Sequence, residues 1–504
     1  MAKFNKSTRG INSKPDTTNA AGFAAFSRDD FKMNVASVVL NTMMKGDSFY
    51  ETESERIKNI ETFVSKDTEN GEFLAKAMVY ARNEGNLRSV SHLMGTLLTE
   101  NVKGTNFLKP ALVKAMIRPD DATEMIALWN TRNPGKMIPN SLRKAVKLSL
   151  ENKWDAYQLR KYFGNGSVKV ANLINIAHPT PKDENQRVMF KQALEGKLPK
   201  IKTAQTVNAG ATGKDRARAY KVMLLERKLG YMAALKNIKN ILEAGADEET
   251  VDALVALLEN EKLVLKSRLL PFRFTQAYVI VDKMNIDRIK AKRILKAIEQ
   301  GFIYSSKNIS IVEDGESVAI LLDESGSMGS WGETSLDEKT PFGIGKTLMA
   351  SMLVGLDKNK TLGYFWADRA REVSVDGSPM EFIKRNDTKG GGTNLGGAIN
   401  LLIESKTKVD KLVIFTDMQQ NEISGWSGQK SFHEIVKDYR KINPDVKILF
   451  WNLEGYGKGT PMKLNDDVLE VSGFSDNMLQ VIPKMWKDKN ALIKEIENID
   501  LKIS

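Results

Sequence analysis

The sequence predicts a multidomain protein, in which an all-α helical-repeat domain is followed by an α/β domain with a doubly wound parallel sheet. Three observations predict this order. Apolar residues recur at helical spacing from about residue 28 to residue 300, short apolar runs alternate with amphipathic helices from residue 311 onward, and turn residues separate these segments. The chain has 504 residues, which is too long for a single hydrophobic core.

The first part of the chain shows the helical spacing in several segments. Their apolar positions lie three or four residues apart, so they share one face of a helix. A weak repeat accompanies them, since AKAMVYA at residues 75–81 is echoed by VKAMIRP at residues 113–119. The offset is near the length of known helical repeats, and it predicts an irregular solenoid of stacked helix pairs.

The second part of the chain changes to a β-α-β pattern. Four apolar runs predict buried parallel strands: VAILLD (318–323), TLGYFWA (361–367), KLVIFTD (411–417) and VKILFWNL (446–453). Three amphipathic segments between them predict the connecting helices: residues 342–356, 394–406 and 431–442. Ligands of such sheets bind at the carboxyl ends of the strands.

Charge divides along the same boundary. Residues 1–310 hold 51 Lys and Arg against 33 Asp and Glu, whereas residues 311–504 hold 24 against 30. A strongly basic first part predicts a polyanionic partner, and the alternative is that lysine-rich helices only solvate a surface. The absence of cysteine excludes disulfides and thiolate metal sites. No apolar run is long enough to predict a transmembrane helix, and residues 1–20 predict a flexible arm or a strand pinned elsewhere.

Oxygen-bearing side chains gather at the predicted strand ends. Asp323, Ser325 and Ser327 follow the first strand, Thr393 lies in the glycine-rich loop KGGGTN, and Asp417 ends the third strand. Carboxylates and hydroxyls are the hard ligands that suit Mg²⁺, or Mn²⁺ in its place. The alternative interpretation is that these are ordinary turn residues.

This combination resembles the metal-ion-dependent adhesion site of von Willebrand factor A domains. The resemblance implies that Asp323, Ser325, Ser327 and Thr393 are metal ligands and that Asp417 acts through water. It further implies that an open metal position accepts a carboxylate from a partner. Because the sequence shows no nucleophile or general base near these oxygens, we expect a binding site and no enzymatic activity.

The whole chain resembles the Ro ribonucleoproteins, which carry a TROVE module. The segments that carry this likeness are ANLINIAHPTP (171–181), MAALKNIKNIL (232–242), SRLLPFRFTQAYVIV (267–281) and KRILKAIEQGFIYS (292–305). The resemblance implies a bacterial or phage-type Ro protein with three parts. These are a flexible arm at 1–20, a TROVE ring of HEAT-like helix pairs at 21–310, and a von Willebrand factor A domain at 311–504.

The same resemblance implies a function. Ro proteins bind noncoding RNA: single-stranded 3′ ends enter a central hole, and structured Y-like RNA lies on the outer basic surface. We therefore expect a monomeric, cytoplasmic protein of RNA quality control, or one that tethers RNA to an exoribonuclease, with no DNA or membrane partner. The main alternative is a metal-dependent protein-binding adaptor that uses the A domain, and a metal-dependent hydrolase ranks third.

Candidate RNA contacts are basic residues of the first part. The resemblance implies His178, although a turn-capping role would explain it equally well. The candidates around it and elsewhere are Arg160, Lys161, Lys169, Arg187, Lys191, Arg88, Lys114, Arg118, Lys214, Arg216 and Arg218. Several of them are spaced to share a helix face, which suits a row of phosphate contacts or, alternatively, a solvated surface.

Overall fold

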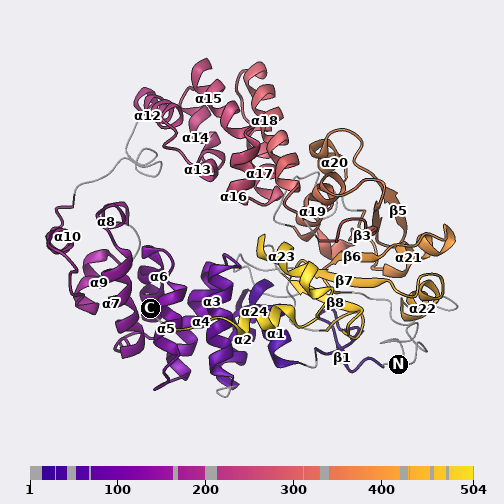
Figure 1. The fold of residues 1–504 in the computed structure, drawn as a ribbon, viewed down its shortest axis with the longest axis horizontal. Coiled ribbons are helices and arrows are strands. Elements are labelled where there is room, and N and C mark those ends of the chain that lie inside the picture. The colour runs from indigo at the N-terminus through magenta and orange to yellow at the C-terminus, as the bar shows by residue number, and fades with distance from the viewer. Residues whose placement is uncertain are drawn as a thin grey trace. The chain divides into compact units, whose positions relative to one another are not determined.

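A computed structural model describes residues 14–28, 30–41, 53–66, 70–162, 168–198, 213–309, 311–329, 340–386, 389–419, 430, 432–454, 459–472 and 476–502. The chain divides into two compact units (Figure 1). The helical unit comprises residues 30–203 and 490–504, and the sheet unit comprises residues 1–29 and 204–489. Within the described ranges, no helix is both long and apolar enough to cross a membrane.

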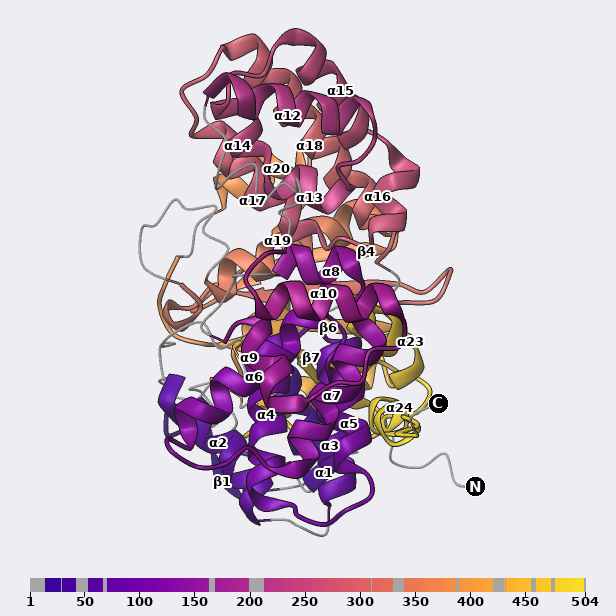
Figure 2. The ribbon, with the colours of Figure 1, turned by 90° about the vertical axis from the view of Figure 1, so that its left-hand side faces the viewer.

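The helical unit is a stack of helix pairs (Figure 2). Its helices are α1 (Phe31–Asn41), α2 (Glu53–Lys66), α3 (Gly71–Asn83), α4 (Arg88–Asn101), α5 (Leu108–Ala115), α6 (Pro119–Arg132), α7 (Asn140–Lys153), α8 (Ala156–Tyr162), α9 (Val170–Ala177), α10 (Glu184–Leu194) and α24 (Ala491–Glu497). The odd-numbered helices from α1 to α9 contact one another in succession, and so do the even-numbered helices from α2 to α10. Two such rows form a helical-repeat solenoid, as the spacing of apolar residues predicts.

The last helix of the chain belongs to the unit that contains the first. Helix α24 packs against α1 and α3. The Lys76 ammonium donates to the backbone oxygen of Glu497 at 2.9 Å, and the Tyr80 hydroxyl donates to the Glu495 carboxylate at 3.1 Å. After building most of the sheet unit, the chain thus returns to the helical unit that contains its first helix.

The sheet unit contains a six-stranded mixed sheet and a short N-terminal hairpin. The strands are β1 (Thr17–Thr18) and β2 (Ala24–Ala25) of the hairpin, and β3 (Val318–Asp323), β4 (Thr361–Trp366), β5 (Ala370–Val373), β6 (Lys411–Thr416), β7 (Lys447–Asn452) and β8 (Val468–Ser472) of the sheet. The order is β5-β4-β3-β6-β7-β8, in which only β5 runs antiparallel to its neighbour. The four predicted strands are confirmed as the parallel centre, whereas β5 and β8 are additional.

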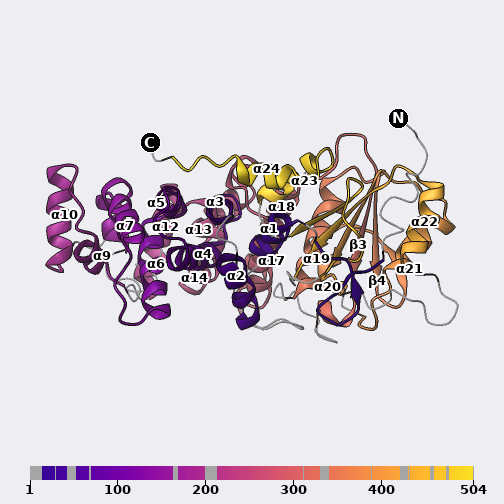
Figure 3. The ribbon, with the colours of Figure 1, turned by 90° about the horizontal axis from the view of Figure 1, so that it is seen from below.

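Helices cover both faces of the sheet (Figure 3). They are α19 (Pro341–Gly355), α20 (Pro379–Arg385), α21 (Leu395–Glu404), α22 (Phe432–Ile442) and α23 (Asp476–Met485). Helix α19 packs on β3, β4 and β6, and α20 lies beside it. On the opposite face α21 packs on β4 and β5, and α22 packs on α21. The predicted α/β architecture is confirmed by these layers.

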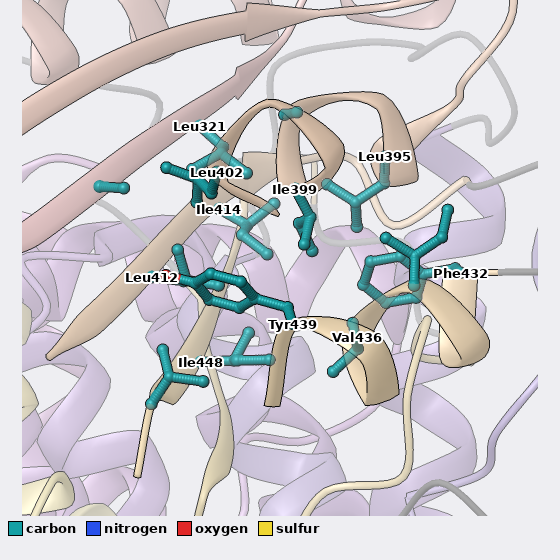
Figure 4. Close-up of a cluster of buried hydrophobic side chains, with 14 of the residues drawn as sticks. Leu321, Leu395, Ile399, Leu402, Leu412, Ile414, Phe432, Val436, Tyr439 and Ile448 are labelled. Atoms are coloured by element: carbon teal, nitrogen blue, oxygen red, sulfur yellow. The ribbon is translucent and has the colours of Figure 1, made fainter. Parts of the chain in front are cut away.

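One hydrophobic core cluster of the sheet unit lies between the sheet and helices α21 and α22 (Figure 4). Leu321 and Ile414 from neighbouring strands meet Ile399 and Leu402 from α21, and all four side chains are fully buried. Tyr439 from α22 lies among them and donates its hydroxyl to the backbone oxygen of Thr407 at 3.1 Å. A buried tyrosine needs such an acceptor, because an unpaired hydroxyl in an apolar core is costly.

Among the described residues, seven helices that precede the sheet belong to the same compact unit as the sheet. They are α12 (Gly213–Leu225), α13 (Tyr231–Lys236), α14 (Ile238–Glu243), α15 (Glu248–Leu258), α16 (Glu261–Ser267), α17 (Pro271–Asp282) and α18 (Arg288–Ser306). Helices α17 and α18 contact α19. The Lys384 ammonium lies 2.9 Å from the Asp282 carboxylate, and the Ser378 hydroxyl donates to Glu299. Packing therefore divides the helices near residue 203 rather than at 310, and a single RNA-binding domain over 21–310 stays a prediction.

The N-terminal hairpin is pinned to the sheet unit. Phe26 exchanges two backbone hydrogen bonds with Thr460, at 2.9 and 3.1 Å. The Arg28 guanidinium makes two hydrogen bonds to the Glu470 carboxylate, and both side chains are about 98% buried. Of the predicted arm at residues 1–20, residues 14–20 thus follow the pinned alternative, and residues 1–13 lie outside the described ranges.

Replacing Arg28 by Met should lower the free energy of unfolding of the sheet unit by about 3 kcal/mol, because it leaves the Glu470 carboxylate buried without its cation. Urea unfolding followed by tryptophan fluorescence measures the change. The double variant Arg28→Met/Glu470→Met should recover most of the loss. A single variant as stable as the parent protein would contradict a buried ion pair.

Candidate functional site

The five predicted oxygen ligands lie at the carboxyl edge of the sheet. Asp323 is the last residue of β3, Asp417 directly follows β6, and these two strands are neighbours. Ser325 and Ser327 lie in the turn after β3, and Thr393 lies in the loop before α21. The backbone amide of Gly326 donates to the backbone oxygen of Gly391, which joins the first loop to the second.

Hydrogen bonds orient the two carboxylates. One Asp323 oxygen accepts from the backbone amide of Ser325 and the other from the Thr416 hydroxyl, each at 2.9 Å. The hydroxyls of Ser325 and Ser327 lie 3.4 Å apart. Asp417 Oδ1 accepts from the backbone amide of Gln419 at 2.9 Å. The loops thus hold both carboxylates in fixed orientations.

Burial dominates the electrostatics of this pair. Both side chains are fully buried, and burial together with the nearby Asp417 raises the pKa of Asp323 to about 8. Burial also raises the pKa of Asp417 to about 6, against the opposing effect of the Ser327 hydroxyl. Two carboxylates that share a buried site must bind a proton or a cation between them.

The glycine-rich loop KGGGTN needs a glycine where its backbone approaches the Asp368 carboxylate closely. Gly391 has φ +94°, which L side chains rarely adopt, and a Cβ there would lie 2.2 Å from the Asp368 carboxylate. That carboxylate accepts from the backbone amide of Gly392 at 2.7 Å. The loop that carries Thr393 is therefore shaped by Asp368 and by a backbone that only glycine tolerates easily.

Three hydrogen bonds near the two carboxylates were not predicted from the sequence. The buried Gln419 donates its side-chain amide to the backbone oxygen of Asp417, and its side-chain oxygen accepts from the backbone amide of Ala21 in the N-terminal hairpin. Glu324, also buried, accepts from Arg371 at 3.0 Å. Gln419 and Ala21 are 398 residues apart in sequence, so no local pattern could pair them.

The donor set fits a hard divalent cation. Asp417 Oδ2 is buried and accepts no hydrogen bond from the described residues, so one carboxylate oxygen is available for a ligand. The described residues hold no group of three or more acidic or histidine side chains that could bind a metal. A cation here would thus be surrounded by two carboxylates and by hydroxyls, which is the oxygen-rich set that Mg²⁺ prefers.

The basic candidates near His178 are mostly exposed. His178 ends α9 in a left-handed conformation with φ +46°, and Lys169 precedes that helix. Lys169, His178 and Lys191 are exposed and form no ion pair with a described residue, whereas Arg187 pairs with Glu184 at 2.8 Å. Arg160 is partly buried, and the side chain of Lys161 lies outside the described set.

Arg88 is engaged in an ion-pair network instead of facing solvent alone. Its guanidinium contacts the carboxylates of Asp120, Asp121 and Glu124 at 2.8 to 2.9 Å. Burial alone would raise the pKa of Asp121, but hydrogen bonds and the charge of Arg82 lower it well below its usual range. The network ties α3 and α4 to α6, which gives Arg88 a structural role.

The remaining candidates are divided between paired and unpaired side chains. Arg118 pairs with Asp120 at 2.8 Å and stacks over Tyr162, and Lys114 is half-buried on α5. On α12 Lys214 and Arg218 are exposed without an ion pair to a described residue, and Arg216 is half-buried. These RNA contacts stay predictions.

Comparison with known proteins identifies one domain and the fold. Residues 169–319 match the TROVE domain family, and residues 394–498 match a domain family of unknown function, DUF7788. The crystal structure of the Deinococcus radiodurans RO (RSR) protein superposes with a TM-score of 0.61, covering 91% of this chain and all of that one, at 16% identity. The predicted TROVE resemblance is confirmed, and at this identity the structural likeness establishes the fold.

Two curated relatives share part of the sequence. Telomerase protein component 1 of Rattus norvegicus is 24% identical over 160 residues, which are 31% of this chain. The Mus musculus protein of the same description is 33% identical over 70 residues, or 14% of this chain. The matches cover 6% and 3% of these much longer relatives, so the likeness is confined to a segment.

In buffer with EDTA, the melting temperature should fall by several degrees as pH rises from 5 to 8. Raised carboxyl pKa values mean that the unfolded chain loses these protons near pH 4, whereas the folded protein keeps them up to about pH 6 for Asp417 and about pH 8 for Asp323. Unfolding thus becomes easier across this window.

Asp323→Asn cannot ionise, so its melting temperature should depend less on pH over the same range. Differential scanning calorimetry at several pH values measures both slopes. The matched control is Asp376→Asn, which changes an exposed loop carboxylate and should keep the parent slope. Equal slopes in Asp323→Asn and in the parent protein would contradict the raised pKa of Asp323.

Proposed function

We propose that this chain, which contains a TROVE domain and has the fold of a bacterial Ro protein, is a Ro-type RNA-binding protein. The observation that carries the proposal is the set of exposed basic side chains at the start of the TROVE match. Lys169, His178 and Lys191 lie around α9 and α10 without an acidic partner among the described residues. We call these three residues the α9–α10 patch.

The α9–α10 patch has the properties of a phosphate-binding surface. Unpaired lysines attract the nucleic-acid backbone without distinguishing sequences, and the release of counterions makes such binding strongly salt-dependent. Cations that are already neutralised by carboxylates, such as Arg88, offer much less attraction. Exposure and lack of an ion-pair partner therefore favour the α9–α10 patch over paired candidates such as Arg88, and Lys214 and Arg218 of α12 share these two properties.

The proposed ligands are noncoding RNAs. By resemblance to Ro proteins, a single-stranded 3′ end would enter a central opening, and a structured Y-like RNA would bind the outer basic surface. The protein would then act in RNA quality control or present RNA to an exoribonuclease. RNA of this kind is recognised mainly through shape, backbone charge and an accessible single strand.

We further propose that the oxygen cluster of the sheet unit binds Mg²⁺ as an accessory site of the von Willebrand factor A type. Asp323, Ser325, Ser327 and Thr393 would hold the ion, and Asp417 would act through water. Such an ion would offer an open position to a carboxylate of a partner protein. The buried, unsatisfied oxygen of Asp417 supports this proposal.

The second candidate function is a metal-dependent adaptor in which the sheet unit captures a protein and the helices serve as a scaffold. The same buried carboxylate pair favours it. It differs from the first proposal in one consequence, since partner capture would require the metal and would not require RNA.

Loss of the α9–α10 patch should weaken RNA binding. In Lys169→Gln/His178→Gln/Lys191→Gln, the affinity for a duplex with a single-stranded 3′ tail should fall roughly tenfold at low salt, and the salt slope by about 0.7 per lost phosphate contact. Fluorescence anisotropy across a salt series measures both. The control Lys58→Gln/Lys103→Gln removes two exposed lysines of the same unit. An equal loss of affinity in both variants would mean that the patch contributes only through the net charge of the protein.

Asp323→Ala separates the two candidate functions. Calorimetric titration should show loss of Mg²⁺ binding, because the central ligand is gone, while RNA affinity stays within about twofold of the parent protein. Circular dichroism and melting temperature establish that the variant is folded. Loss of RNA binding in a folded Asp323→Ala protein would argue against the Ro-type proposal and for a metal-centred function.

A further inference from the structure

Helix α18 begins with five cations that fall into two groups. The residues are Arg288, Lys290, Lys292, Arg293 and Lys296. One group pairs with acidic side chains of α15, and the other pairs with none. This division decides which of them can attract an outside ligand.

Lys290 and Arg293 form the paired group. The Lys290 ammonium lies 3.1 Å from the Glu248 carboxylate, and the Arg293 guanidinium contacts the same carboxylate at 3.2 Å. Arg293 also pairs with Asp252. These contacts join α18 to α15 within the sheet unit, so their charges are neutralised by the fold.

Arg288, Lys292 and Lys296 form the unpaired group, which we call the α18 stripe. All three are exposed, and none forms an ion pair with a described residue. They are four residues apart, so they lie along one face of the helix with about 6 Å between successive positions. Ile289 projects beside them with 73% of its surface exposed.

The acidic residues of the helix do not neutralise the positive charge of the stripe. The Asp287 carboxylate accepts from the backbone amides of Ile289 and Lys290, each at 3.0 Å, and so caps the helix. Glu299 accepts from the Ser378 hydroxyl of α20. Two of the first amides of the helix are thus occupied by Asp287, and we attribute the attraction of the stripe for anions to its three side chains.

We propose that the α18 stripe is a second phosphate-binding surface for RNA, made of different residues from the α9–α10 patch. The inference rests on the proposed RNA-binding function and deepens it. Evenly spaced single charges along one line suit a polymer whose charge repeats regularly, as in a nucleic-acid backbone. The exposed Ile289 adds an apolar contact for a base or sugar. An acidic protein segment is the competing ligand.

The test compares two variants with equal loss of charge. Arg288→Gln/Lys292→Gln/Lys296→Gln removes the stripe and leaves the pairs to α15 intact. The control Lys358→Gln/Lys408→Gln/Lys437→Gln removes three exposed lysines of the same unit that form no ion pair with a described residue. The probes are a 20-nucleotide single-stranded RNA and a hairpin with a single-stranded 3′ tail.

We expect the stripe variant to bind at least one RNA roughly tenfold more weakly than the parent protein at 100 mM salt. Each lost phosphate contact lowers the slope of log affinity against log salt by about 0.7, so the loss of three contacts lowers it by up to about 2. The control should stay within twofold of the parent protein. Equal losses in stripe variant and control would overturn the proposal, because the stripe would then act only through net charge. RNA binding by the stripe variant that equals that of the parent protein would also overturn the proposal. This holds even if the variant binds poly-glutamate, a model of an acidic protein segment, more weakly than the parent protein does.

Failure of this inference can be told from failure of the proposed function. If the parent protein binds neither RNA, the proposed function fails and this inference fails with it. If the parent protein binds and only the α9–α10 patch variant is weakened, the RNA-binding function stands and the stripe is rejected.

Lysine acetylation of the parent protein, followed by mass spectrometry, provides a second readout within one helix. Bound RNA should protect Lys292 and Lys296 several-fold more than Lys290, which is already paired with Glu248. Equal protection of the three lysines would contradict a surface confined to the stripe. Because this experiment needs no substitution, it does not depend on a variant that folds.

Discussion

The sheet unit depends on one constraint, which is that its central parallel strands have no face exposed to solvent. All six residues of β3 and all six of β6 are buried. A parallel sheet of this kind must be covered on both sides, and α19 with α20 and α21 with α22 do so. Polar groups that follow these strands can then gather only at the carboxyl edge, where Asp323 and Asp417 meet.

Burial at that edge leaves the carboxylate oxygens of Asp323 and Asp417 in need of hydrogen bonds, and the surrounding loops supply only some of them. Hydroxyls and backbone amides satisfy three of the four oxygens of Asp323 and Asp417, and the fourth accepts nothing from the described residues. Two ionised carboxylates in a buried site carry a large desolvation penalty unless a cation or a proton lies between them. The N-terminal hairpin takes part in this arrangement, because Ala21 holds Gln419 and Gln419 holds Asp417.

The excess of positive charge on the chain has two distinct uses. Some cations form ion pairs within the protein, as Arg82 and Arg88 do with Asp121 and as Arg28 does with Glu470. Others, such as Lys191 and Lys292, remain exposed without an acidic partner among the described residues. Only the second kind can attract phosphate strongly, so the surface available to the proposed RNA ligand is smaller than the net charge of +12 implies.

The sequence by itself determined the central strands, the helices between them and the identity of the oxygen cluster, because apolar periodicity and the D-x-S-x-S, G-T and T-D residues are local signals. It also indicated the TROVE domain through several separate segments. Tertiary structure alone decided that α12–α18 belong to the unit of the sheet, that α24 packs against α1 and α3, and that Ala21 contacts Asp417 through Gln419. It also decided which lysines are unpaired, since an ion pair between helices joins residues tens of positions apart and leaves no periodic trace in the chain.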